Sequence, residues 1–166
     1  MPHQNARKKW GKYKLGCVAN QAGNGVYLVN GKVVTPHRVI DPGAVQIVGE
    51  RIGGVFTLGQ VPIPEDAQII DVKGAWIIPG LIDIHVHGGG GGDTMDASIE
   101  SLRLMAAAHA QGGTTAITPT TITSGTEELI AALDSFAEAQ GAVTGGARLL
   151  GVHLEGPYFS YEQRGA

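Results

Sequence analysis

Short runs of β-branched and other apolar residues fill the first part of the chain, and turn-forming residues separate them. The runs lie at residues 26–29, 32–35, 44–48, 52–58 and 69–72. Between the first two runs stands Asn30-Gly31, a pair typical of two-residue hairpin turns because both turn positions need a positive φ angle. The third and fourth runs flank Gly49-Glu50-Arg51 and form a second predicted strand pair. Short strands at this spacing predict a small β-sandwich segment over residues 23–75.

From residue 76 the pattern changes to buried strands that alternate with amphipathic helices. Strands are predicted at 81–87, 114–118 and 149–155, and helices at 98–111 and 126–140. The first strand is so continuously apolar that we expect burial on both of its faces, and five glycines after it predict a wide turn. Ser124 or Thr126 is the expected cap of the second helix. The β-α-β-α-β order predicts an α/β fold with a parallel sheet.

Composition and charge narrow the class of protein. The chain has 166 residues, 43% hydrophobic and 16% charged, with a net charge of -3. Five of its basic residues stand in residues 1–22, which contain no acidic residue and which we expect to be a disordered basic tail. The remainder is acidic, which disfavours nucleic acid as a partner. Cys17 is the single cysteine, and no apolar stretch is long enough to span a membrane, so we expect a cytoplasmic location and no membrane partner.

Two histidines at the end of the first buried strand are the leading candidates for metal binding. Side chains alternate across a strand, so His85 and His87 point to the same side and can reach one divalent cation. They stand at the carboxyl end of a predicted parallel strand, where α/β barrels hold their active sites. A bare His-x-His pair is a weak motif, but its strand-end position and the glycines that follow strengthen the prediction.

Glu155 and His153 form a second candidate pair, at the end of the third predicted strand. The same alternation puts both side chains on one face. A carboxylate beside imidazoles suits Zn²⁺ or Fe²⁺, although Glu155 could equally belong to an ion pair. His153 is expected beside the ligands rather than among them.

Other polar residues stand close to these strand ends in the sequence. Thr120, Thr121 and Thr123 follow the second strand and are expected to line the mouth of the site. Asp93 and Asp96 follow the glycines and could bind substrate hydroxyls or serve as ordinary caps.

Several motifs together resemble a known family. Asn30–Val34 and Pro79–Gly88 are similar to the start of the amidohydrolase superfamily. Gly113–Thr115, Pro119–Ser124 and above all Gly151–Tyr158, Gly-Val-His-Leu-Glu-Gly-Pro-Tyr, resemble the N-acetylglucosamine-6-phosphate deacetylases within it. The resemblance covers residues 25–166. It implies a (β/α)₈ TIM-type barrel, of which residues 76–166 supply the first three β/α units after the β-sandwich segment.

The resemblance also implies the chemistry. It makes Glu155 the principal metal ligand, with His85 and His87 matching a pair that holds a second metal in some members. The implied reaction removes the acetyl group from N-acetylglucosamine 6-phosphate, with one or two divalent ions, zinc or iron, and the complete enzyme is expected to be a homo-oligomer. The family's catalytic aspartate and two further histidine ligands would fall beyond residue 166, so we expect this truncated piece alone to be inactive.

Two other interpretations stay open at this point. One is a different amidohydrolase, dihydroorotase-like or deaminase-like, which would share His85 and His87. The other is a non-catalytic barrel fragment that serves as a binding or scaffold module.

Overall fold

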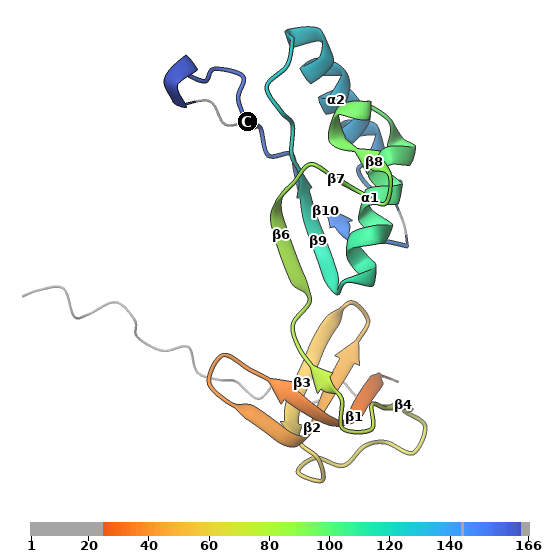
Figure 1. Cartoon of the computed structure of the whole chain (residues 1–166). Helices are drawn as coiled ribbons and strands as arrows, with labels where there is room; N and C mark the ends of the chain where they lie inside the picture. Colours follow the sequence, from red (N-terminus) through yellow and green to blue (C-terminus); the bar gives the residue numbers. More distant parts are fainter. Residues whose placement is uncertain (1–24, 144, 164–166) are drawn as a thin grey trace, which may run out of the picture. The chain divides into compact units, whose positions relative to one another are not determined.

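The computed structural model describes residues 25–143 and 145–163 of a mixed α/β chain (Figure 1). These residues divide into two compact units, with the boundary between Pro79 and Gly80. The expected basic tail, residues 1–22, and Cys17 within it lie outside the described residues. None of the helices among the described residues is long and apolar enough to cross a membrane.

The first unit contains one five-stranded sheet. Its strands are β1 (Val26–Val34), β2 (Val39–Val48), β3 (Arg51–Thr57), β4 (Gln68–Asp71) and β5 (Trp76–Ile77). The order is β3-β2-β1-β4, with β5 also paired to β1. The β1, β2 and β3 strands are antiparallel neighbours, whereas β4 and β5 run parallel to β1. The predicted strand pair around Gly49–Arg51 is therefore confirmed.

The prediction of a hairpin turn at Asn30-Gly31 is wrong. Both residues lie inside β1, where the register with β2 shifts on either side of Gly31. Asn30 does adopt the positive φ that its type permits, +59°, but it uses that angle for a bulge within the strand. The turn between β1 and β2 comes later, where the Thr35 hydroxyl donates to the Arg38 carbonyl at 2.7 Å.

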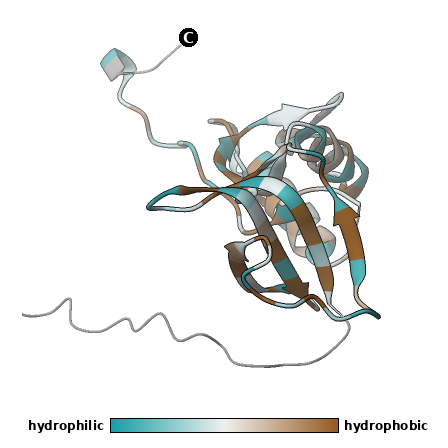
Figure 2. Cartoon of the chain, turned by 90° about the horizontal axis from the view of Figure 1, so that it is seen from below, coloured by the Kyte–Doolittle hydropathy of each residue, from teal (hydrophilic) through white to brown (hydrophobic). Residues whose placement is uncertain are grey.

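The bulge changes which face of the sheet the rest of β1 supplies. Before it, Tyr27 and Val29 pack in one cluster with Ala44; after it, Val33 packs in the other cluster with Val45. Because Ala44 and Val45 are consecutive on β2, the two clusters lie on opposite faces. The extra residue therefore moves the odd-numbered side chains of β1 from one apolar face to the other, and Figure 2 shows the apolar residues along these strands.

The second unit is a three-stranded parallel sheet with two helices, as the alternation predicts. Its main elements are β6 (Leu81–Val86), α1 (Ile99–Gln111), β9 (Thr114–Pro119), α2 (Thr126–Ala139) and β10 (Arg148–Leu149), with a short helix η2 (Tyr161–Gln163) near the end. The strand order is β10-β9-β6, and both pairings are parallel.

The third strand is much shorter than predicted. Instead of running from 149 to 155, regular pairing ends with β10 at Leu149, and one isolated parallel bridge joins Thr120 to His153. Bonds from the His153 amide to the Pro119 carbonyl, 2.9 Å, and from the Thr121 amide to the His153 carbonyl, 3.0 Å, hold this segment beside the end of β9. The bridge, rather than a continuous strand, delivers residues 153–155 to the sheet edge.

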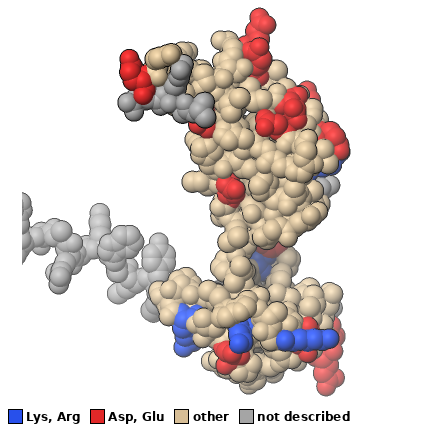
Figure 3. All heavy atoms as spheres, in the orientation of Figure 1, with Lys and Arg blue, Asp and Glu red and all other residues tan. Residues whose placement is uncertain are grey.

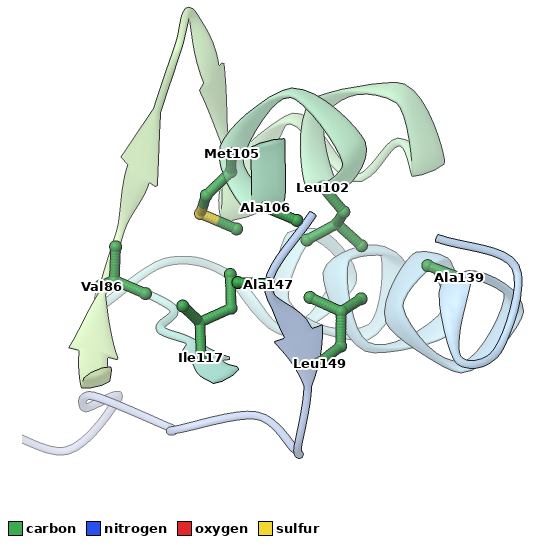
Figure 4. Close-up of a cluster of buried hydrophobic side chains, with 8 residues drawn as sticks. All are labelled: Val86, Leu102, Met105, Ala106, Ile117, Ala139, Ala147 and Leu149. Atoms are coloured by element: carbon green, nitrogen blue, oxygen red, sulfur yellow. The ribbon is translucent and has the colours of Figure 1, made fainter. Parts of the chain in front are cut away.

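The core of the second unit lies between the helices and the sheet. Leu102 and Met105 of α1 pack with Ile117 of β9 and Leu149 of β10 (Figure 4). Val86 is the β6 residue that belongs to this cluster. The expectation that β6 is buried on both faces is wrong for this chain. Its residues Leu81, Ile82 and Ile84 are 52%, 62% and 69% exposed.

The two helix starts differ. Ser98, the first residue of the predicted helix, is the cap of α1, with its hydroxyl accepting from the Ser101 amide at 3.1 Å. The prediction that Ser124 or Thr126 caps α2 is wrong, because Gly125 occupies the cap position and no side chain bonds there. Glu127 and Glu128 in the first turn still favour this end electrostatically.

The glycine run after β6 is ordered rather than a wide turn. It forms a small hairpin of β7 (Gly88–Gly89) and β8 (Gly92–Asp93), followed by the short helix η1 (Thr94–Asp96). A Cβ atom at Gly92 would overlap the backbone of Ser101 on α1. The glycines are thus needed because the hairpin backbone lies directly on the helix.

Candidate metal centre

Two histidines from one strand end and a glutamate that is distant in the sequence meet at the carboxyl end of β6. His85 Nε2 lies 2.9 Å from Glu155 Oε2, and His87 Nε2 lies 3.0 Å from the same oxygen. The two Nε2 atoms are 3.3 Å apart. Each residue thus offers one ligand atom to a common point, and the sequence prediction named all three.

The local structure explains why these atoms converge. His85 ends the regular part of β6 together with Val86, and His87 follows on the same side of the strand. The His85 amide donates to Asp83 Oδ1 at 3.1 Å, and this local bond stabilises the backbone at the end of the strand. Glu155 arrives from the segment that the Thr120–His153 bridge holds beside β9.

The His87 ring has a defined tautomer. Its Nδ1 lies 3.2 Å from the Thr120 carbonyl oxygen, which can only accept a hydrogen bond. His87 Nδ1 therefore carries the proton, and in the neutral ring Nε2 presents a lone pair toward Glu155 and His85. Two acceptors 3.0 Å apart repel each other unless a proton or a cation lies between them.

A divalent cation fits this donor set. Ligand atoms around a tetrahedral zinc ion with bonds of about 2.1 Å are about 3.4 Å apart, close to the separations of 2.9 to 3.3 Å here. Two imidazole nitrogens and one carboxylate oxygen match zinc or iron in type. The side chains of His85, His87 and Glu155 are 50%, 38% and 36% exposed, so a bound ion would keep open positions for water or substrate.

His153 lies beside the three atoms rather than among them. Its ring stands perpendicular to that of His85, with the ring centroids 4.6 Å apart. Its Nδ1 is 3.5 Å from the Thr120 hydroxyl, at the outer limit of a hydrogen bond. This edge-to-face contact limits the positions open to the His85 ring. That His153 supports the ligands without binding the metal stays a prediction.

The threonines after β9 do not all line the mouth of the site as expected. Thr120 and Thr121 are completely buried, whereas Thr123 is exposed. The Thr120 hydroxyl accepts from the Val86 amide at 2.9 Å, and the Thr121 hydroxyl accepts from the Glu155 amide at 3.3 Å. The expectation failed because the bridge between Thr120 and His153 buries residues 120 and 121. Strand alternation in β9 alone does not reveal this pairing.

Two contacts behind the histidine pair were missed from the sequence. The amide and hydroxyl of Thr94 both donate to the His87 carbonyl, at 2.8 and 2.9 Å. His109 of α1 places Nε2 3.1 Å from the Gly88 carbonyl. No residue pattern indicates either contact, because both acceptors are backbone carbonyls that folding brings within reach.

Asp93 and Asp96 serve as caps rather than as free substrate ligands. Asp93 Oδ1 accepts from the Met95 amide, and Asp96 Oδ2 accepts from the Asp93 amide, which forms a reciprocal box around η1. The Ser101 hydroxyl, and after it the Asp93 amide, hold the pKa of Asp96 below its ordinary value. Of the two alternatives left open by the sequence, the structure supports the cap.

Negative charge dominates the unit that carries the site. Residues 80–163 contain ten Asp and Glu residues, and their basic residues are Arg103 and Arg148. Figure 3 shows the acidic side chains distributed over this unit on the visible face. A surplus of negative charge favours a cation at the histidine–glutamate cluster.

Known proteins share this chain's sequence pattern and fold. Residues 76–164 match the amidohydrolase family. Over 137 residues the chain is 39% identical to N-acetylglucosamine-6-phosphate deacetylase of Bacillus subtilis (strain 168), with 81% of this chain and 34% of the relative covered. N-acetylgalactosamine-6-phosphate deacetylase of Shewanella sp. (strain ANA-3) is 35% identical over 135 residues, covering 81% and 34%.

A solved structure shows the same similarity. The crystal structure of N-acetylglucosamine-6-phosphate deacetylase from Pasteurella multocida superposes with a TM-score of 0.74 at 32% identity, covering 83% of this chain and 36% of that one. The chain thus spans about a third of the length of the relatives it matches. In α/β barrel enzymes the active sites lie at the carboxyl ends of the parallel strands, which is where this chain carries its two histidines. The chain belongs to the amidohydrolase family.

Proposed function

We propose that this chain supplies the metal-binding part of a deacetylase that acts on an N-acetylated amino sugar 6-phosphate. The observation that carries the proposal is the convergence of His85, His87 and Glu155 in a chain 39% identical to a named N-acetylglucosamine-6-phosphate deacetylase. The reaction would hydrolyse the amide to give glucosamine 6-phosphate and acetate, as a step of amino sugar metabolism.

The proposed cofactor is one or two divalent ions, zinc or iron, held by His85, His87 and Glu155. When bound, such a metal lowers the pKa of water and polarises an amide carbonyl. This chain's own residues orient the ligands: the Thr120 carbonyl sets the tautomer of His87, and the His153 ring limits the positions of His85.

Other parts of the reaction are proposed to lie outside these 166 residues. The catalytic aspartate and two further histidine ligands are expected on later strands of a (β/α)₈ barrel, of which residues 76–166 would form the first three units after a β-sandwich segment at 23–75. Phosphate recognition is proposed to use cations other than the two arginines that the structure describes in this unit. Arg103 of this unit already pairs with Glu100 at 2.7 Å, and Arg148 lies at the start of β10, the opposite end from the site.

The sugar could alternatively be N-acetylgalactosamine 6-phosphate. The Shewanella relative that carries this name is 35% identical, close to the 39% of the Bacillus relative. We place N-acetylglucosamine 6-phosphate first because it is the named substrate of the more similar of these two proteins and of the superposed Pasteurella structure. A cytoplasmic location and a homo-oligomeric complete enzyme belong to the same proposal.

A chimera tests the proposed reaction. Residues 25–166 replace the matched segment of the Bacillus subtilis relative, and acetate release is measured with both sugar phosphates. We expect turnover of N-acetylglucosamine 6-phosphate by the chimera, and none by the 166-residue chain alone. A Glu155→Gln chimera is the matched inactive control.

The other outcomes separate the alternatives. A folded, metal-loaded chimera that hydrolyses neither sugar phosphate contradicts the proposed deacetylase function. Activity on dihydroorotate would favour the dihydroorotase-like hypothesis. A folded chimera that retains no metal would favour a non-catalytic module.

A further inference from the structure

Most of the buried polar side chains among the described residues stand behind the candidate metal centre. The four are Thr94, Thr120, Thr121 and Ser135, and the first three contact the segments that carry His85, His87 and Glu155. A buried hydroxyl costs free energy unless it is hydrogen-bonded. Valine has nearly the same shape without that cost, so packing alone does not require threonine here.

Thr120 joins the end of β6 to the segment that follows β10. Its hydroxyl accepts from the Val86 amide at 2.9 Å and donates to the Thr118 carbonyl at 3.1 Å. Its amide donates to the Val86 carbonyl at 2.8 Å, and its carbonyl accepts from His87 Nδ1 at 3.2 Å. Val86 stands between the two histidines, so Thr120 holds the backbone of the pair and one of its rings.

Thr121 makes the corresponding contact to the third ligand candidate. Its hydroxyl accepts from the Glu155 amide at 3.3 Å, and its amide donates to the His153 carbonyl at 3.0 Å. Two consecutive buried residues therefore reach the histidine pair on one side and Glu155 on the other. The separation of the ligand atoms depends on this connection, because Glu155 stands 70 positions after His85 in the sequence.

We propose that Thr120 and Thr121 are positioning residues of the metal centre: their buried hydroxyls fix the backbone of the His85–His87 pair and of Glu155 at the spacing that a divalent cation requires. The inference rests on the proposed function. Loss of a partner that orients a metal ligand typically weakens metal binding about 10- to 100-fold. Thr120 should matter more than Thr121, because its bond to Val86 is shorter, 2.9 against 3.3 Å.

The test measures Zn²⁺ affinity of the 166-residue chain by competition with a chromophoric chelator. We expect Thr120→Val to bind zinc about 10-fold more weakly and Thr121→Val about 3-fold more weakly. Thr120→Ser and Thr121→Ser keep the hydroxyls and should restore affinity to within about 2-fold of wild type. Ser135→Ala is the matched control: it removes a buried hydroxyl that bonds to Ala132 within α2, so it should lower thermal stability without changing zinc affinity.

A second readout requires no metal. Long-range ¹⁵N spectra of the histidine rings report which nitrogen carries the proton, and His87 should be protonated at Nδ1 in the wild-type chain. Thr120→Val keeps the backbone carbonyl that accepts from His87 Nδ1 but loses the hydroxyl bond to Val86 that holds the two segments together, so it should give a mixture of tautomers, whereas Ser135→Ala should not. If Thr120→Val does not fold, as judged by circular dichroism, Thr121→Val and its serine counterpart decide the question.

The outcomes distinguish this inference from the function on which it rests. Wild-type chain that fails to bind zinc contradicts the metal centre itself. Wild-type binding that Glu155→Gln abolishes, but that folded valine variants leave unchanged, contradicts only the positioning role. An equal loss of affinity in Ser135→Ala would also overturn it, because the effect would then reflect general destabilisation.

Discussion

The two units bury their sheets by different means. In the first unit the buried side chains among the described residues are apolar, and they form clusters on both faces of one sheet. In the second unit the apolar cluster lies between the helices and the sheet. All the buried polar side chains among the described residues belong to this second unit. The buried residues of the first unit thus serve packing. In the second unit, buried hydroxyls are also retained, and we have proposed that two of them position the metal ligands. The following experiments can break or sharpen that distinction.

The largest expected effect comes from the core of the second unit. Leu102 is 1% exposed in the cluster between α1 and the sheet, so Leu102→Ala should lower the free energy of unfolding by about 2–5 kcal/mol. Leu104→Ala on the same helix, 41% exposed, should cost only about 0.5 kcal/mol. Chemical denaturation gives both values.

Amide hydrogen exchange then shows where the Leu102 effect is felt. Faster exchange should appear in β6, β9 and β10 and not in β1, β2 and β3. Equal loss of protection in both sheets would contradict a division into separately packed units.

A smaller effect is expected at the bulge of the first unit. Asn30 has a φ of +59°, a region that costs most L-residues about 1–2 kcal/mol. Asn30→Val should therefore destabilise the chain by about that amount, while Asn30→Gly should stay within about 0.5 kcal/mol of wild type. Thermal or urea unfolding measures both, and a fully tolerated valine would show that this residue does not form the bulge described here.

The smallest effect is a pH dependence that both units share. The Lys73 amide and then the Asn30 side chain lower the pKa of Asp71, as the Ser101 hydroxyl and Asp93 amide lower that of Asp96. Each ionised carboxylate therefore stabilises the fold above the pKa of the unfolded state, and this contribution is lost as pH falls through the lower, folded-state pKa.

Unfolding measured from pH 7 down to about 3 checks this linkage. Asp71→Asn and Asp96→Asn should each be slightly less stable than wild type at neutral pH, and the difference should disappear in acid. A difference that grows as pH falls would have the wrong sign for a lowered pKa.

Periodicity predicted the second unit better than the first. The change from short strands to alternating strands and helices located β6, α1, β9 and α2 to within a few residues, because buried strands and amphipathic helices differ in apolar spacing. Asn30-Gly31 misled because a positive φ serves a bulge as well as a turn. Only pairing with β2, a nonlocal property, decides between the two.

The sequence predicted the ligands of the candidate site but not the residues that position them. Strand alternation and the family resemblance together named His85, His87 and Glu155. Alternation left Glu155 between a metal ligand and an ion-pair partner, and the resemblance favoured the ligand. Regular pairing of the third strand in fact ends six residues earlier, at Leu149. The roles of Thr94 and Thr120 depend on backbone groups brought together by folding, and no residue pattern along the chain reveals such partners.

Metal content tests the central claim most directly. The 166-residue chain is dialysed against Zn²⁺ and then against metal-free buffer, and the bound zinc is determined by elemental analysis. We predict about one equivalent in wild type, retained by His37→Ala, whose exposed histidine belongs to the first unit, and lost from His85→Ala, His87→Ala and Glu155→Gln. Zinc content in folded Glu155→Gln equal to that of wild type, or none in wild type, would contradict the assignment of His85, His87 and Glu155 as a metal centre.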